Sequence, residues 1–253
     1  MTNRAATSAR LAAAAALLIS FGGAARARAL EISPTLIQLS PEETNAVLRV
    51  RNEGAGEVRF QVQVTRWSES PQGEMQLAPT QDVIVFPRLL ALRPGEERNL
   101  RVGAGVAFGP VEKSYRVFLE ELPAAERPGG PAQVRVLSRI GIPVFLARSD
   151  AAPKLSIEDL QVSGGRAEFT LRNRGTAHDR PVEIRLSLVD AAGKEVFQRS
   201  FNPWYLLAGG ERRYEEAIPE AVCARVRELK VEARGPRETQ TASRAAPDGT
   251  CAR

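Results

Sequence analysis

The sequence predicts an all-β protein made of two tandem immunoglobulin-like β-sandwich domains. Short segments rich in Val, Ile, Leu and Phe alternate with polar residues and are interrupted by Pro, Gly and Asn at close spacing, which is typical of strands rather than helices. Roughly seven short strands per hundred residues, with no long amphipathic helix, is the pattern of an immunoglobulin-like sandwich. The two halves of the chain also repeat each other, which favours two domains over one.

Residues 1–29 have the pattern of a cleavable signal peptide. Arg4 and Arg10 precede an uncharged run from Leu11 to Ala25, and a small-x-small cleavage pattern ends at Ala29. We therefore expect cleavage near Ala29-Leu30 during export. Because the run is shorter than the about 20 residues that span a bilayer, we expect no membrane insertion; a transmembrane helix over the same run is the alternative.

The first domain is expected over residues 30–147. Its apolar segments alternate with polar residues and are bounded by Pro, Gly, Asn or charged turns, so each is interpreted as a strand. The predicted strands are Leu30–Ser33, Ala46–Arg51, Val58–Trp67, Val83–Phe86, Glu97–Val102, Ser114–Leu119 and Val134–Phe145.

The second domain is expected over residues 154–234, after a short linker in which the strand pattern stops. From residue 235 the chain becomes polar and rich in Thr, Ser, Ala and Pro, so residues 235–253 are expected to form a flexible tail. The predicted strands are Leu155–Val162, Arg166–Leu171, Val182–Val189, Glu195–Phe201, Arg212–Ala217 and Arg225–Ala233.

Two pairs of segments repeat in the same order in both halves. A strand ends in Asn-x-Gly at Asn52 (LRVRNEG) and again at Asn173 (TLRNRG). Further on, LLALRPGEER over residues 89–98 is echoed by LLAGGERR over residues 206–213. Asn and Gly tolerate positive φ and end strands in tight turns, so the repeats indicate one sandwich used twice; chance similarity between turns is the alternative.

The charge of the exported chain is nearly balanced. The whole sequence has 35 basic and 30 acidic residues, and the signal peptide holds four of the arginines and no acid, which leaves 31 basic residues afterwards. A nucleic-acid-binding protein needs a basic patch that collects several phosphates. We therefore expect no nucleic-acid partner.

The sequence holds no set of residues that suits catalysis. Its single histidine, His178, lies beside a turn and is interpreted as incidental, and one histidine cannot make a histidine-based metal cluster. The glycine pairs lack the helix that a phosphate loop opens. We expect a protein that is not an enzyme, uses no cofactor or metal and binds other proteins.

Both cysteines lie near the C-terminus. An oxidising exported compartment would let Cys223 and Cys251 form a disulfide, although the spacing does not fix their separation. Two unpaired thiols are the alternative.

A block of motifs in the first half is more specific than a general sandwich pattern. It runs from VFPRLL (residues 85–90) through LRPGE (92–96) and LRV (100–102) to KSYRVFLEELP (113–123). Over residues 30–147 this order of motifs resembles the periplasmic pilus-assembly chaperones of the chaperone/usher pathway, the fimbrial chaperone family, in a divergent branch.

The resemblance implies a function and a set of partners. Two immunoglobulin-like domains in an L or boomerang arrangement would reside in the periplasm, bind pilin or fimbrial subunits and deliver them to an outer-membrane usher. Binding would use donor strand complementation, in which the chaperone lends an edge strand to a subunit that lacks its last strand. Self-association through the donor edge would hide that edge when no subunit is bound.

The strand that matches the family's donor strand is Val134–Phe145. Its period of two places Val134, Val136 and Ile140 on one face. By resemblance this is the subunit-binding face, with Val134 and Val136 as donated side chains; the alternative is that they fill the protein's own core. Pro143 is compatible with an edge strand.

The resemblance also implies two cations that grip the C-terminal carboxylate of the subunit. At the corresponding places this chain has Leu36 and Gly141, which carry no charge. Arg139, on the same strand face as Gly141, and Arg88 are the candidates for a replacement anchor. Ordinary solvated arginines are the alternative for both.

Three further charges are interpreted as structural. Glu96, Arg101 and Glu121 lie at turns or strand ends, where they are expected to bridge strands and brace the corner between the domains. For the chain as a whole, the alternative to a chaperone is a structural or adhesive envelope module with two immunoglobulin-like domains.

Overall fold

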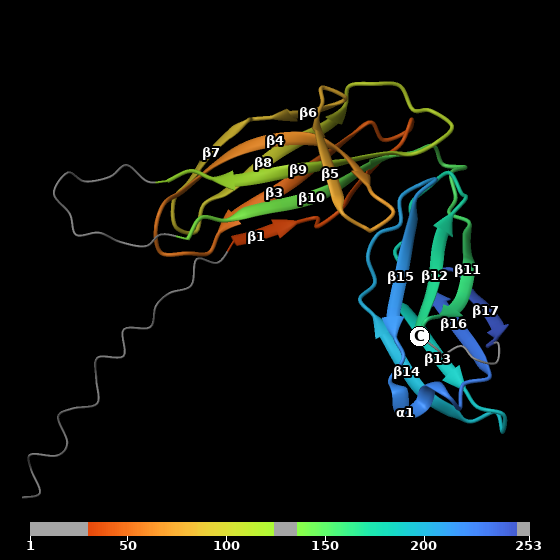
Figure 1. The fold of residues 1–253 in the computed structure, drawn as a ribbon. Helices are drawn as coiled ribbons and strands as arrows, with labels where there is room; N and C mark the ends of the chain where they lie inside the picture. Colours follow the sequence, from red (N-terminus) through yellow and green to blue (C-terminus); the bar gives the residue numbers. More distant parts are fainter. Residues whose placement is uncertain (1–29, 124–135, 247–253) are drawn as a thin grey trace, which may run out of the picture.

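The computed structural model describes residues 30–123 and 136–246, and these ranges consist mainly of β-strands. Figure 1 shows two β-sandwiches set at an angle, the first formed by β1 to β10 and the second by β11 to β17. The all-β prediction of two tandem immunoglobulin-like sandwiches in an L or boomerang arrangement is confirmed. The predicted signal peptide lies outside the described residues.

The first sandwich consists of two sheets. One has the strand order β1-β3-β8-β6, and the other has the order β2-β10-β9-β4-β5, with β7 also paired to β4. The strands are β1 (Leu30–Ser33), β2 (Ile37–Leu39), β3 (Asn45–Asn52), β4 (Val58–Glu69), β5 (Met75–Pro79), β6 (Val83–Phe86), β7 (Leu89–Leu92), β8 (Glu97–Ala104), β9 (Lys113–Glu121) and β10 (Arg139–Leu146).

The second sandwich pairs a three-stranded sheet, β11-β12-β15, with a four-stranded sheet, β14-β13-β16-β17. One short helix, α1 (Glu220–Cys223), precedes β16. The strands are β11 (Leu155–Ser163), β12 (Arg166–Asn173), β13 (Glu183–Val189), β14 (Glu195–Phe201), β15 (Glu211–Ala217), β16 (Glu228–Arg234) and β17 (Thr239–Ala245).

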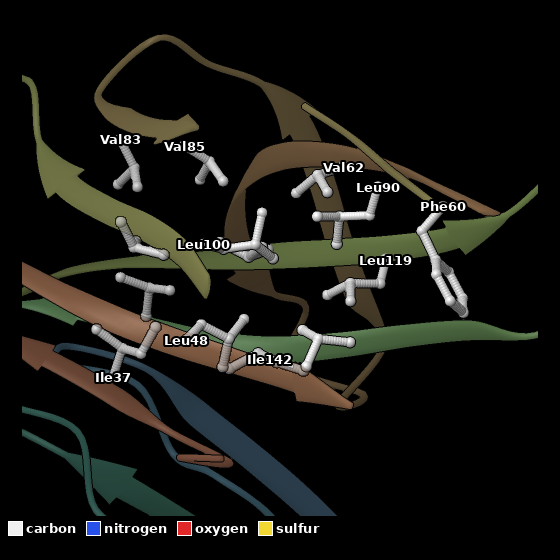
Figure 2. Packing of buried hydrophobic residues seen from close by; sticks show 14 of the residues in the cluster. Ile37, Leu48, Phe60, Val62, Val83, Val85, Leu90, Leu100, Leu119 and Ile142 are labelled. Atoms are coloured by element: carbon white, nitrogen blue, oxygen red, sulfur yellow. The ribbon is translucent and has the colours of Figure 1, made fainter. Parts of the chain in front are cut away.

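The alternation of apolar residues along the strands builds the core of each sandwich. On β3, Leu48 and Val50 are fully buried while Val47 and Arg49 are exposed, and Leu100 on the neighbouring β8 is buried too. Figure 2 shows such side chains from both sheets of the first sandwich meeting between them. Each fully buried aliphatic side chain contributes about 1.5–3 kcal/mol.

The repeated asparagines play the same part in both sandwiches. Asn52 donates from Nδ2 to the carbonyls of Gly56 and Leu92, at 2.8 and 3.0 Å, and its Oδ1 accepts the N–H of Gly54. Asn173 donates to the carbonyls of Ala177, Leu206 and Leu207, and its Oδ1 accepts the N–H of Gly175. Each asparagine is buried and ties the end of its strand to the second repeated segment of its own domain.

Four strands were missed by the sequence analysis, and one begins later than expected. The short strands β2 and β7 and the fully exposed β5 carry too little alternation to be recognised. Within the described residues, the predicted strand Val134–Phe145 is a strand only from Arg139. The reason is that β9 ends at Glu121, whose N–H makes the last ladder bond to the carbonyl of Ser138 at 2.9 Å.

The prediction of a flexible tail from residue 235 was wrong for its first part. Thr239–Ala245 forms β17, which pairs with β16 along its whole length. Because β17 is an edge strand, it is held mainly by backbone hydrogen bonds and needs few apolar residues, so composition did not reveal it. The rest of the predicted tail, from residue 247, lies outside the described residues.

Candidate functional site

One half of β10 has an open edge. β9 pairs with β10 along its whole length, whereas β2 pairs with it only over Val144–Leu146. Among the described residues, no strand pairs with the outer edge of Arg139–Pro143. In an antiparallel ladder alternate residues bond to the neighbour. Since Ser138 bonds to β9, the backbone groups of Arg139 and Gly141 point to the open edge.

The residues before this edge are exposed apolar ones. Val136 is 80% exposed and Leu137 is 45% exposed. Val134, the other predicted donor residue, lies outside the described residues. Ile140 is placed differently, because it packs partly against the protein's own core. Of the three predicted subunit-binding residues, Val136 is therefore the one whose side chain is free in the described part of the chain.

The two candidate anchor arginines do not meet. Arg139 forms an ion pair with Glu120 at 2.6 Å, and its guanidinium carbon lies 3.9 Å from the centre of the Phe118 ring. Arg88 is exposed just before β7, which β4 and β9 separate from β10. Arg139 thus already has partners on its own domain.

Two of the three charges predicted to be structural, Glu96 and Glu121, make local contacts within the first domain. Glu96 accepts the N–H of Arg93 at 2.9 Å, which lowers the pKa of its carboxyl, and it pairs with Arg98. Glu121 is buried and accepts the N–H of Ser138 at 3.1 Å. Arg101 is exposed on the outer face of its sheet.

The corner between the domains is built from other residues. Trp67 on β4 and Phe145 on β10 form a buried cluster with Tyr205 and Leu207, which lie between β14 and β15. Leu36 packs against this cluster. The corner is therefore apolar at the place where the resemblance leads one to look for a cation. These residues are far apart in the sequence, so no local pattern predicted the cluster.

Hydrogen bonds hold the corner on one side through Glu112 and His178. The Glu112 carboxylate accepts the His178 N–H at 3.0 Å and lies 2.8 Å from Nδ1 of the ring. The same ring stacks on Phe145 with a centroid separation of 3.6 Å. The interpretation of His178 as incidental was wrong, because its side chain is nearly buried between the domains.

On another side, Arg212 of β15 holds the tip of the β4–β5 hairpin. Its Nη2 lies 3.5 Å from the Glu69 carboxylate and donates to the carbonyl of Gly73 at 3.2 Å. Gly73 has a positive φ of 82°, and a Cβ there would lie 2.6 Å from Arg212 Nε. Burial raises the pKa of Glu69 despite the charge of Arg212. The positive φ and the guanidinium group packed against Gly73 both favour glycine at this hairpin tip.

Arg116 lies at the centre of the corner. Its guanidinium carbon is 4.1 Å from the centre of the Trp67 ring and 5.5 Å from that of Trp204, so it is flanked by one tryptophan from each domain. Burial lowers the pKa of Arg116. In the sequence, this arginine is recognisable only as part of the strand motif KSYRVFLEELP.

The outer face of the sheet β1-β3-β8-β6 carries an exposed apolar patch formed by Val47, Ile84 and Phe86. Phe86, Arg101 and Val47 are register partners across three strands, and Ile84 lies one pair further along the same face. Phe86 is 71% exposed. Exposed apolar side chains gathered on one face indicate a protein-binding surface.

The remaining chemical features concern the cysteines, metals and membrane spans. Cys223 is buried and disulfide-bonded, while Cys251, its predicted partner, lies outside the described residues. In residues 30–123 and 136–246 there is no group of three or more His, Cys, Asp or Glu that could hold a metal ion. Within the same ranges, no helix has the length and apolar character needed to cross a membrane.

The first domain matches the sequence model of one protein family. Residues 29–149 match the family described as "Pili and flagellar-assembly chaperone, PapD N-terminal domain". No curated protein matches the chain in sequence.

Solved structures with the same fold cover most of the chain. A chain of the CsuC–CsuE chaperone-tip adhesion subunit pre-assembly complex from archaic Csu pili of Acinetobacter baumannii is 17% identical, with a TM-score of 0.58 over 87% of this chain and 100% of that one. The CupB2 chaperone of Pseudomonas aeruginosa is 16% identical, with a TM-score of 0.51 over 85% and 100%. A chain of the Salmonella enterica SafA pilin–SafB chaperone complex is 12% identical, with a TM-score of 0.54 over 85% and 96%.

Proposed function

We propose, because the first domain of this chain belongs to the family of pili and flagellar-assembly chaperones, that the protein captures and caps pilus or fimbrial subunits in the periplasm. The observation that carries the proposal is the open edge of β10. Over Arg139–Pro143 this strand has a neighbour on one side only.

An open edge next to exposed apolar side chains is suited to strand addition. Backbone groups of the edge supply hydrogen bonds to an incoming strand, and alternate side chains fill pockets in the partner. Arg139 and Gly141 offer such backbone groups, and Val136 offers the side chain. Val134, two residues earlier, continues the same alternation in the sequence. Ile140, by contrast, anchors the donor strand to the protein's own core.

The exposed patch of Val47, Ile84 and Phe86 is proposed to contact the outer-membrane usher. It lies on the sheet β1-β3-β8-β6, whereas the donor edge belongs to the other sheet of the same sandwich. A subunit bound along β10 therefore leaves the patch exposed. This separation suits a protein that must hold one partner while it presents that partner to another.

Without a subunit, the donor edge is a liability, since an unpaired apolar edge invites aggregation. We propose that two copies associate through this edge when no subunit is present. A mixture of free protein and subunit should then shift from the dimer to a one-to-one complex.

The proposal is tested by co-expressing the mature chain with each small exported protein encoded beside it, followed by affinity purification from the periplasm. A one-to-one complex that is lost on Val136→Asp supports strand donation. The matched control is Val182→Asp, which changes a valine of the second domain that is also exposed. Strand donation is wrong if Val136→Asp captures subunits as the wild type does, or if no neighbouring product co-purifies. Either result would favour the alternative, a structural or adhesive envelope module.

A further inference from the structure

A cavity of about 430 Å³ lies between the two domains, beside the segment that links them. It is lined by Glu43 of the first domain, by Arg148 of the linker, and by residues 177–180 and 236–237 of the second domain. No residue of the range 139–143 lines it, so it is separate from the open edge of β10. Its volume falls within the roughly 300–1,000 Å³ that is typical of small-molecule pockets. A ligand in this cavity would contact both domains at once.

One wall of this cavity holds a buried carboxylate with an unpaired oxygen. Asp179 lines the cavity and is only 7% exposed. Its Oδ1 accepts the N–H of Arg180 at 2.7 Å, whereas its Oδ2 has no hydrogen-bond partner in the part of the chain that the structure describes. Buried polar atoms are nearly always paired in folded proteins. The free oxygen of Asp179 therefore lacks a donor that a ligand in the cavity could supply.

The backbone around Asp179 holds this acceptor in place. The Asp179 N–H donates to the carbonyl of Leu206 at 3.0 Å, and the Asp179 carbonyl accepts the Leu206 N–H at 2.8 Å. A Cβ on Gly235 would lie 2.9 Å from Asp179 Oδ2. Because Gly235 has no side chain, space remains next to the unpaired oxygen. The carboxylate is thus fixed before any ligand arrives, which lowers the entropy cost of binding.

The charge around Asp179 favours a cationic donor. Burial raises the pKa of Asp179, although the Arg180 N–H and the charge of Arg237 act in the opposite direction. An ammonium group would supply the positive charge that this carboxylate lacks, together with N–H donors, and bonds between charged groups are the stronger ones. Glu43 adds a second carboxylate on the first-domain side of the cavity.

The cavity also holds a cation that is available to a ligand. Three arginines line it, and two of them are engaged: Arg148 pairs with Asp150 at 3.1 Å, and the guanidinium carbon of Arg180 lies 5.2 Å from the centre of the Tyr205 ring. Arg237 is exposed in the tight turn between β16 and β17, and it forms no ion pair or ring contact within residues 30–123 and 136–246. Arg237 is therefore the arginine that can receive a carboxylate.

We propose that this cavity binds a small zwitterion, a free amino acid or a short peptide, whose ammonium group is held by Asp179 and whose carboxylate is held by Arg237. A simple anion would leave Asp179 without a donor, and a simple cation would leave Arg237 without an acceptor, so a ligand with both charges suits the site best. Free amino acids and short peptides share this chemistry. Since the walls of the cavity come from both domains, the bound ligand restrains the angle between them.

The test is isothermal titration calorimetry on the whole mature protein, without any subunit. Four probes are titrated: alanine and alanylalanine, which are zwitterions; N-acetyl-alanylalanine, which lacks the ammonium group; and alanylalanine amide, which lacks the carboxylate. We expect saturable binding of at least one zwitterion. Each blocked probe should bind at least about tenfold more weakly, because it loses one hydrogen bond between charged groups.

Variants and a second measurement complete the test. Asp179→Asn and Arg237→Gln should each bind the zwitterion at least about tenfold more weakly than the wild type. The matched control is Arg225→Gln, which should bind as the wild type does, because Arg225 follows α1 at the end of the second sandwich far from the first (Figure 1). In case Asp179→Asn does not fold, the amide resonances of Arg180 and Arg237 in the wild type are followed by nitrogen-15 NMR and should shift with the same saturation.

The outcomes separate the two sources of the ligand and are independent of subunit capture. Binding of alanine identifies free amino acids as the ligand class, and binding of alanylalanine alone identifies peptides; either supports the inference. It is overturned if neither zwitterion binds saturably, if a blocked probe binds as well as its parent, or if the Arg180 and Arg237 resonances do not shift. Such a failure would leave Val136-dependent capture of subunits untouched.

Discussion

Glu112 and His178 join the two domains: one carboxylate oxygen of Glu112 accepts the His178 backbone N–H at 3.0 Å and lies 2.8 Å from the ring Nδ1. Because the ring also stacks on Phe145, strand β10 and the second domain share this contact. Together with the Arg212 contact to the hairpin tip, it fixes the domains at one angle.

Removing the carboxylate should therefore loosen the joint. Glu112→Ala is expected to lower the free energy of unfolding by about 1–3 kcal/mol, because a buried N–H and a buried ring lose their acceptor. It should also broaden the distribution of interdomain distances measured by double electron–electron resonance. Glu97→Ala removes an exposed ion pair with Arg49 instead and should cost at most about 1 kcal/mol. An unchanged distance distribution for Glu112→Ala would contradict the account of the joint.

The two repeated asparagines should each stabilise their own domain. Asn173→Ala removes the side-chain donor to the carbonyls of Ala177, Leu206 and Leu207, of which the last two keep a backbone donor, so it should cost about 1–3 kcal/mol. In calorimetry, Asn173→Ala should lower the stability of the second domain, seen in the unfolding transition of that domain. Asn52→Ala should lower the stability of the first domain in the same way. Asn99→Ala, on the exposed face of β8, is the control and should stay within about 0.5 kcal/mol. Equal effects of Asn52→Ala and Asn99→Ala would refute this role.

Glu158 should make the second domain sensitive to acid. Hydrogen bonds from Arg174 and Ser156 lower the pKa of Glu158 from 4.5 to about 2. The unfolded chain therefore binds this proton at higher pH than the folded chain, so the stabilisation is present above about pH 4.5 and is lost as the pH falls through about 2. In urea unfolding, the difference between wild type and Glu158→Gln should shrink over this interval. A difference that stays constant from pH 7 to 2 would rule out this linkage.

The exposed patch should matter for delivery and not for capture. Val47→Asp combined with Ile84→Asp places two charges on the outer face of its sheet, far from any donor contact. We expect the subunit complex to form as before while surface fibres disappear from cells viewed by electron microscopy. Val182→Asp should leave both intact. Loss of subunit capture in the double variant would show that the patch belongs to the donor site instead.

The sequence predicted the sandwiches because their signals are local. Alternation marks strands such as Asn45–Asn52, and Asn-x-Gly followed by a second repeated segment marks the domains, since Asn52 and Asn173 each satisfy several backbone groups at a strand end. The edge strand Thr239–Ala245 lacks such a signal because backbone pairing to β16 suffices to hold it.

The corner between the domains could not be predicted in the same way. Trp67 and Arg116 lie on neighbouring strands of the first domain, but Trp204 of the second domain reaches Arg116 only because the two sandwiches pack at one angle. No residue pattern near Trp204 or Arg116 in the sequence indicates that angle. His178 was misinterpreted for the same reason. Strand β10 was easier to locate, because its alternation and its neighbouring motifs are local. Ile140, which was predicted to lie on the subunit-binding face, packs partly against the protein's own core.

The most direct test of the central claim is amide hydrogen exchange at Gly141, whose N–H points to the open edge of β10. In the free monomer this amide should exchange fast, while those of Ile140 and Ile142, which point towards β9, should be protected. On binding a subunit the Gly141 amide should become protected as well, because strand addition gives it a hydrogen-bond partner. If Gly141 exchanges as fast in the complex as in the free protein, the subunit is not held by the edge of β10.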